Sequence, residues 1–241
     1  MNILSIGNSF SQDAQRYLHQ VAKADNFEIN AFNLYIGGCP LSLHYRNMIS
    51  KRPEYDLEMN GQSTGFKVSV NEALLNRDWD IVTIQQVSHE STNFDTFVPY
   101  IDELTAYIRK CVPKAKILVH RTWGYETGSE RIARVNFKTC EEMNLAAKAA
   151  YKKAAERIGA DGIIPAGDCM MNLEKMGLAP HRDTFHADLG YGRYAIALTW
   201  YGYLTGNDVM ENKFKDFDVS VTENEIKAAK EAADKALKEN I

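Results

Sequence analysis

The sequence lacks three features that would narrow its function at once: a long apolar run, a strong net charge and paired cysteines. No apolar run approaches the roughly 20 residues that a membrane-spanning helix needs. Lys and Arg number 28 and Asp and Glu number 32, so the formal net charge is −4, with both signs interspersed. Neither nucleic acid nor an anionic membrane is therefore expected as a partner.

Cofactor signatures are also missing. The four cysteines, Cys39, Cys111, Cys140 and Cys169, form no CxxC pair, and no Cys/His spacing supports a zinc site. We expect them to be reduced thiols. Because there is no nucleotide-binding fingerprint or other strong metal-ligand cluster, the sequence predicts neither a cofactor nor a metal.

The N-terminus has no basic region, and its apolar run meets Gly7 and Asn8 too soon for a signal peptide. We expect a cytoplasmic protein, or a secreted one if a leader has been removed. The 241 residues, with 45% apolar and 25% charged side chains, show no repeat or linker and suit a single α/β domain over 1–241. The oligomeric state stays open.

Short apolar runs alternate with helical patterns along the chain. The predicted strands are 2–6, 28–36, 80–85, 115–120 and 162–165. The predicted helices are 12–24, 94–111, 144–158 and 222–239. Strands that alternate with helices predict a mainly parallel sheet covered on both faces. We therefore expect an α/β fold, a three-layer α/β/α sandwich with a five-stranded, flavodoxin-like sheet.

Residues 51–69 interrupt this alternation. Two stretches, 55–59 and 66–70, alternate apolar and polar residues around the turn-forming segment 60–65. This pattern predicts a β-hairpin insertion. A lid, a dimer contact and a plain surface elaboration all remain open as its role.

A serine follows the first predicted strand on a tight turn, in the segment Gly-Asn-Ser-Phe-Ser at 7–11. In an open α/β sheet, ligands bind beyond the carboxyl ends of the strands, where Ser9 lies. Gly7 allows a sharp turn and a close approach to a ligand. Ser9 is therefore a candidate nucleophile, and the alternative is that Ser9 or Ser11 only caps the following helix.

A second motif, Asp183-Thr184-Phe185-His186, lies shortly before the last apolar helical pattern. An Asp and a His three residues apart on one loop can point to the same place, so His186 is a candidate base and Asp183 its orienting acid. Asp188 is a rival acid and His181 a rival base. The alternative is a capping or salt-bridged pair without catalysis.

Together these segments resemble the SGNH (GDSL-like) hydrolase family. That family places its serine in a first block, usually Gly-Asp-Ser, where this chain has Gly-Asn-Ser at 7–9, and its last block, Asp-x-x-His, is matched at 183–186. The resemblance implies a nucleophile at Ser9, a base at His186 and an orienting acid at Asp183. Its second block, a glycine after strand two, falls at 37–40 and implies that the Gly38 N–H lines the oxyanion hole.

The third block departs from the family pattern. The family has Gly-x-Asn-Asp, with the Asn side chain donating to the oxyanion, whereas this chain has Gln-Gln-Val-Ser-His at 85–89. A glutamine amide donates the same N–H from a longer stem, so we expect Gln85 or Gln86 in the oxyanion hole. Ser88 is a weaker candidate. The alternative is that these polar residues only close a strand.

Two further residues are candidates for substrate binding. His44 follows Gly38 closely and is placed to line the pocket, and Trp123 follows the fourth predicted strand, where an aromatic ring would stack on a sugar. A satisfied histidine and a core tryptophan are the competing interpretations.

The resemblance implies a serine esterase with a Ser-His-Asp mechanism. We expect a small-molecule or carbohydrate ester as substrate, and an acetyl ester first. Two non-enzymatic alternatives remain: a flavodoxin-like module that binds a small anion or carbohydrate, and an inactive relative that only binds carbohydrate.

Overall fold

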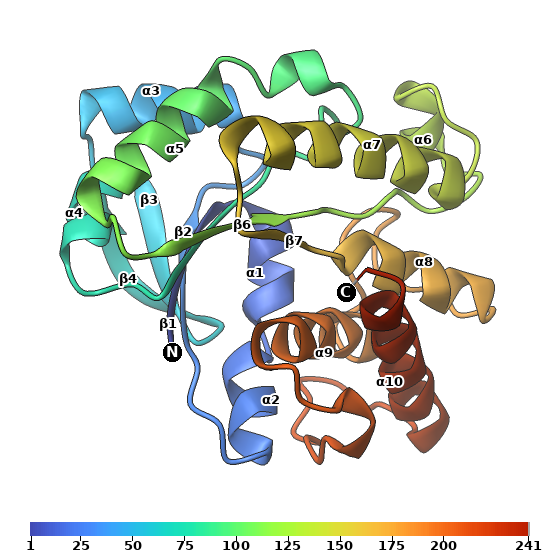
Figure 1. Cartoon of the computed structure of the whole chain (residues 1–241). Helices are drawn as coiled ribbons and strands as arrows, with labels where there is room; N and C mark the ends of the chain where they lie inside the picture. Colours follow the sequence, from blue (N-terminus) through green and yellow to red (C-terminus); the bar gives the residue numbers. More distant parts are fainter. Residues whose placement is uncertain (241) are drawn as a thin grey trace.

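A seven-stranded sheet forms the middle layer of the protein, as the computed structural model shows for residues 1–240 (Figure 1). Its strand order is β4-β3-β2-β1-β5-β6-β7. The strands are β1 (Asn2–Gly7), β2 (Asn30–Tyr35), β3 (Tyr55–Met59), β4 (Gln62–Val68), β5 (Ile81–Ile84), β6 (Lys116–His120) and β7 (Gly162–Ile164).

The parallel part of this sheet agrees with the sequence, but the predicted count of five strands is wrong. Strands β2, β1, β5, β6 and β7 pair in parallel, which confirms the α/β class. The two additional strands, β3 and β4, pair antiparallel and extend the same sheet from the side of β2. The insertion therefore forms one edge of the sheet, because β3 pairs with β2 without a break in register.

The hairpin turn is tighter than the sequence suggests. Asn60 and Gly61 have φ values of 52° and 77°, and β4 starts at Gln62, so the predicted six-residue turn at 60–65 is wrong. An Asn-Gly pair with both φ angles positive matches the twist of a two-residue hairpin.

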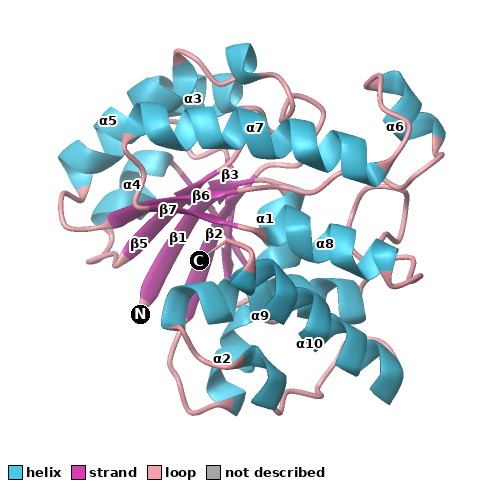
Figure 2. Ribbon diagram, turned by 45° about the vertical axis from the view of Figure 1, so that its right-hand side comes forward, coloured by secondary structure: helices cyan, strands magenta, loops and turns pink. Residues whose placement is uncertain are grey.

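Helices cover both faces of the sheet (Figure 2). One layer contains α3 (Leu41–Ser50), α4 (Val70–Leu75), α5 (Tyr100–Cys111) and α7 (Cys140–Ile158). The other contains α1 (Ser9–Gln15), α2 (Leu18–Ala24), α8 (Ala166–Lys175), α9 (Tyr191–Thr205) and α10 (Glu223–Lys238). The helix α6 (Glu130–Arg134) and two 3-10 turns, η1 (Phe94–Thr96) and η2 (Val209–Glu211), lie in the connections.

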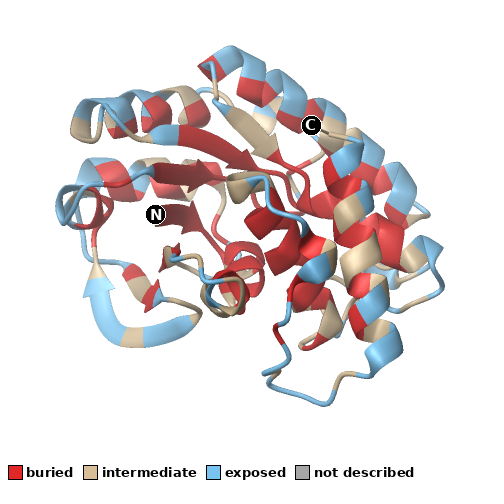
Figure 3. Cartoon of the chain, turned by 60° about the horizontal axis from the view of Figure 1, so that its bottom comes forward, coloured by how far each residue is buried: buried red, intermediate tan, exposed pale blue. Residues whose placement is uncertain are grey.

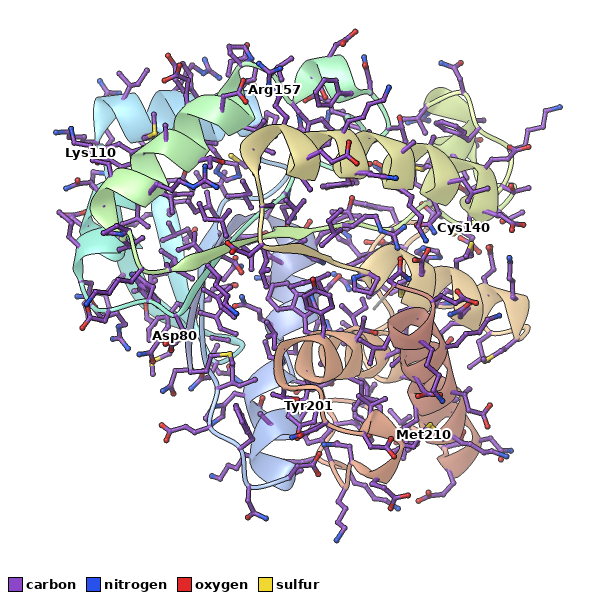
Figure 4. All side chains as sticks on the ribbon, viewed as in Figure 1. Asp80, Lys110, Cys140, Arg157, Tyr201 and Met210 are labelled. Carbon is purple, nitrogen blue, oxygen red and sulfur yellow. The ribbon has the colours of Figure 1, made fainter. Side chains whose placement is uncertain are left out.

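Each helical layer has its own apolar core against the sheet. Figure 3 shows the central strands mostly in the colour of buried residues, whereas the edge strand β4 is largely exposed. In Figure 4, Lys110 and Arg157 lie on the upper helical layer and Tyr201 in the lower one. Burial on both faces explains why β1, β5 and β6 are mostly apolar runs in the sequence.

Local capping explains where the helices begin and end. The side chains of Thr222 and Glu225 form a capping box at the start of α10, which confirms the predicted final helix. The predicted helix 94–111 is instead a 3-10 turn followed by α5, which begins directly after Pro99. A proline fixes φ and lacks an N–H, so it suits a helix start and not an interior.

Two findings concern membrane-spanning helices and the state of the cysteines. None of the helices in residues 1–240 is both long and apolar enough to cross a membrane. All four cysteines are free thiols, and Cys39, Cys140 and Cys169 are buried.

Candidate active site

The candidate nucleophile lies where the chain leaves the central strand. β1 ends at Gly7, Asn8 caps α1, and Ser9 is the first residue of that helix. The side chain of Asn8 accepts a hydrogen bond from the Phe10 N–H at 3.0 Å. β1 lies between β2 and β5, to which the chain crosses in opposite directions, so this turn is the topological switch point of the sheet.

The structure brings Asp183 and His186 to Ser9. The Ser9 Oγ and His186 Nε2 atoms lie 2.8 Å apart, and His186 Nδ1 lies 2.7 Å from Asp183 Oδ2. The other Asp183 oxygen accepts from the His186 backbone N–H at 2.9 Å. The three side chains therefore form an unbroken line of hydrogen bonds from carboxylate to hydroxyl.

The ionisation of Asp183 and the backbone conformation of Thr184 both bear on how this hydrogen-bonded line works. Partial burial opposes ionisation of Asp183, but the hydrogen bonds from His186 outweigh it and hold the pKa of this carboxyl below its usual range. Thr184, between the two residues, has a φ of 75°, a strained conformation for a β-branched residue. Such strain persists where the surroundings fix the backbone, as they often do at active sites.

Asp13 joins the helix of the nucleophile to the loop of the base. It is fully buried, one turn after Ser9 on α1, and accepts a hydrogen bond from the Ala187 N–H at 3.1 Å. Its oxygens also lie 3.0 Å from Arg182 Nη1 and 2.8 Å from Arg193 Nη2. One carboxylate thus fixes the residues on both sides of His186 relative to α1.

Trp123 is close to the site, but it does not line the pocket. Its ring is fully buried and stacks on Phe10 with 4.2 Å between centroids, and its Nε1 donates to the Phe185 carbonyl at 2.8 Å. The expected role in binding a sugar is therefore corrected: Trp123 supports the loop that carries His186.

Gly38 lies in the loop after β2 and lines the same cavity as Ser9. Its φ of 62° requires a left-handed conformation, and a Cβ there would meet nothing within 4 Å. The Asn8 Nδ2 donates to the next carbonyl, that of Cys39, at 3.2 Å, which ties this loop to the serine turn. Within the described part of the chain, the Ser9 and Gly38 backbone N–H groups donate to no protein acceptor.

The structure does not bring either glutamine to Ser9, contrary to expectation. Gln85 uses its amide to donate to Asn8 Oδ1 at 2.8 Å, and its carbonyl lies 2.7 Å from His120 Nδ1. Gln86 donates to the Thr96 carbonyl at 2.9 Å. Both side chains are buried, and their N–H groups are engaged in holding neighbouring segments.

His44 is also placed differently from the sequence expectation. It is fully buried, with Nδ1 lying 2.9 Å from the Tyr55 hydroxyl, so it is packed behind the Gly38 loop and does not line the cavity. Burial lowers its pKa to about 3, which keeps the imidazole neutral. Its role as a substrate-binding residue is corrected to a core one.

The rival residues are occupied elsewhere. His181 Nε2 lies 3.0 Å from the Gly124 carbonyl, and Asp188 accepts from the Gly190 N–H at 2.9 Å.

A cavity of about 360 Å³ opens above Ser9. Ser88, the weaker candidate of the third block, lines it, and its hydroxyl lies 2.8 Å from that of Tyr125. Sequence reasoning missed Tyr35, Tyr125, Arg131 and Arg182, which also line it. Over residues 1–240, no group of three or more His, Cys, Asp and Glu side chains is placed to hold a metal ion.

Comparison with known proteins gives a family match over nearly the whole chain. The family model described as "Domain of unknown function (DUF4886)" matches residues 2–236. A solved structure of a DUF4886 family protein from Bacteroides uniformis is 33% identical, with a TM-score of 0.92 over 98% of this chain and 94% of the other. No curated protein matches the sequence.

More distant solved structures share the fold. TesA is 13% identical, with a TM-score of 0.53 over 86% of this chain and 99% of the other. A putative GDSL-like lipase from Parabacteroides merdae is 16% identical, with a TM-score of 0.54 over 85% and 95% of the two chains. At these identities the likeness establishes a shared fold alone.

Proposed function

The chain belongs to the DUF4886 family, and for this member we propose a serine esterase that hydrolyses a small carboxylic ester. The observation that carries the proposal is the hydrogen-bonded line from Asp183 through His186 to Ser9 at a cavity floor. The three groups meet with the geometry that activates a serine hydroxyl.

In the proposed reaction, the Ser9 hydroxyl attacks the ester carbonyl and His186 Nε2 accepts its proton. His186 then gives this proton to the leaving alcohol, and an acyl group remains on Ser9. Asp183 accepts the Nδ1–H hydrogen bond, which keeps Nε2 facing Ser9 and stabilises the imidazolium. A water molecule, deprotonated by His186, then attacks the acyl carbon; the bond to Ser9 breaks, His186 returns the proton to the Ser9 oxygen, and the carboxylic acid leaves.

Two backbone groups and one side chain are proposed to bind the oxyanion. Ser9 and Gly38 line the cavity, and their backbone N–H groups donate to no acceptor in the described part of the chain. We assign the third donor to Ser88 in place of Gln85 or Gln86, because Ser88 lines the cavity and the glutamine amides donate elsewhere. A donor aimed at the developing charge is worth about 10²–10³ in rate.

The size of the cavity favours a short acyl group. Its 360 Å³ lies near the lower end of ligand pockets, which supports acetyl over a long aliphatic chain. The half-buried ring of Tyr35 in its wall suits the face of a sugar, so an acetylated carbohydrate is the proposed substrate class.

Replacement of the nucleophile tests the activity. Wild-type protein is expected to react with a fluorophosphonate serine probe and to hydrolyse 4-nitrophenyl acetate and acetylated sugars. Ser9→Ala should do neither while keeping its far-UV circular dichroism and melting temperature, because the hydroxyl lies at a half-exposed turn. The exposed Ser220→Ala variant is the matched control.

Two results would contradict the esterase proposal. Hydrolysis of these esters by Ser9→Ala at the wild-type rate would require another nucleophile. A wild-type protein that neither reacts with the probe nor hydrolyses any ester, yet binds sugars, would favour a binding module instead.

A further inference from the structure

The cavity above Ser9 is lined by cationic groups in a protein that is negative overall. These cations are Arg131 and Arg182, and the lining of the cavity within residues 1–240 includes no Asp or Glu. The whole chain has a formal charge of −4, so this is a local reversal of sign. Cavities lined by one sign of charge concentrate ligands of the opposite sign.

The neighbouring carboxylates only partly offset these cations. Asp13 lies beneath Arg182 but is shared with Arg193. Asp218 in turn is shared between Arg193 and Arg16. This connected group therefore has three guanidinium groups and two carboxylates, and Arg182 is its member at the cavity wall. Asp183 is already engaged with His186.

Arg131, on α6, is the cation that remains free for a ligand. Its side chain is exposed, and among the described residues no carboxylate lies within 4.0 Å of it. The adjacent Glu130 pairs instead with Arg134 at 3.3 Å. An Arg with no acidic partner at a cavity wall is available to an external anion.

The position of Arg131 relative to the base is fixed by stacking. Its guanidinium carbon lies 3.8 Å from the centroid of the Phe185 ring, and that ring lies 3.7 Å from the ring of His186. A guanidinium stacked on an aromatic face keeps its N–H groups directed outward in its own plane, where they match the two oxygens of a carboxylate. The Phe185 and His186 rings therefore lie between the Arg131 guanidinium and the Ser9 hydroxyl.

We infer that Arg131 binds an anionic group of the ester substrate, such as a carboxylate, and so makes the enzyme selective for acidic esters, with Arg182 adding to the positive potential. This inference rests on the proposed esterase function and narrows its substrate class. The inference also assigns a role to the short helix α6, which carries Arg131 at the cavity.

Matched pairs of esters that differ by one charge test the inference. On the alcohol side, the pair is 4-acetoxybenzoate and 4-acetoxybenzamide. On the acyl side, it is the 4-nitrophenyl monoester of glutaric acid and 4-nitrophenyl valerate. For each pair, the ratio of kcat/KM of the anionic to the neutral ester is measured in wild type and variants, so intrinsic reactivity cancels between proteins.

Arg131→Gln should lower this ratio about tenfold in at least one pair, and the pair that responds identifies the side of the ester that carries the anion. Arg131→Lys should restore part of the ratio, since it keeps the charge but not the planar fork. Arg134→Gln, on the same helix and paired with Glu130, is the control and should leave the ratio unchanged. The wild-type ratio should also fall as salt is raised from 0.05 to 0.5 M.

An unchanged ratio in Arg131→Gln for both pairs, with the neutral esters still hydrolysed, would overturn the inference alone. If the wild type hydrolyses none of the four esters, nor 4-nitrophenyl acetate or acetylated sugars, and does not react with the serine probe, the proposed function on which the inference rests is overturned instead.

Discussion

Acidification from pH 7.5 to pH 5 should destabilise this protein through two buried histidines. His44 and His120 are both fully buried, and their Nδ1 atoms lie near the Tyr55 hydroxyl at 2.9 Å and the Gln85 carbonyl oxygen at 2.7 Å. Burial lowers the pKa of His44 to about 3. Burial, aided by the charge of Arg121, lowers the pKa of His120 to about 3 as well.

The sign and size of the effect follow from proton linkage. The unfolded chain binds a proton at each histidine below a pKa of about 6.5, while the folded chain does not until about pH 3. The stability that depends on these neutral rings is therefore present above pH 6.5 and is lost as the pH falls toward 3. At about 1.36 kcal/mol per pH unit, each histidine costs about 2 kcal/mol at pH 5, and the pair about 4 kcal/mol.

Urea unfolding followed by fluorescence at pH 7.5, 6.5, 6.0, 5.5 and 5.0 measures this loss. The slope of unfolding free energy against pH should approach about 2.7 kcal/mol per unit below pH 6. His44→Gln and His120→Gln should each remove about half of the slope, whatever they do to absolute stability, and the exposed His89→Gln should leave it unchanged. A flat profile in the wild type, or an unchanged slope in both buried-site variants, would refute the reasoning.

The remaining predictions concern catalysis. Asp183→Asn should lower kcat about 10²–10⁴-fold while Ser9 still reacts slowly with the fluorophosphonate probe, because the change disturbs His186 and not the nucleophile; wild-type kcat would contradict this role. Although partial burial opposes it, hydrogen bonding with His186 holds the pKa of Asp183 below its usual range, so Asp183 is ionised at neutral pH; the pH profile of kcat/KM should therefore change in Asp183→Asn, and an unchanged profile would argue against their coupling. Ser88→Ala should lower kcat about 10²-fold with KM little changed, whereas Gln85→Ala should mainly cost about 1–3 kcal/mol of unfolding free energy; the reverse pattern would return the donor role to Gln85.

The parts of the structure that the sequence predicts best are those encoded locally. Buried strands are recognised as apolar runs. The capping box of Thr222 and Glu225, a motif of four residues, marks the start of α10. The helix α8 was missed because it follows Pro165 directly and contains Gly167, and both residue types are typical of turns and loops.

The site residues that were misplaced depend on partners far away in the sequence. Gln85 faces Asn8 and His120, and Trp123 donates to Phe185. No local pattern distinguishes a glutamine that ends a strand toward a ligand from one that ends it toward the core. The motif order was sufficient to place Ser9, Asp183 and His186 at one edge of the sheet, because that edge follows from parallel strand topology.

Residues outside the Gly-Asn-Ser and Asp-x-x-His motifs hold Ser9 and His186 together. Ser9 and His186 lie 177 residues apart in the sequence, yet the distance between them is set by two contacts of α1: Phe10 stacks on Trp123, which donates to Phe185, and Asp13 accepts from the Ala187 N–H. Asp13 is fully buried and its carboxylate bonds to Arg182 and the Ala187 N–H, so an Asp13→Asn change, which keeps the shape but removes the charge, would weaken these contacts. The alignment of base and nucleophile is therefore a property of the first helix as much as of the loop that carries His186.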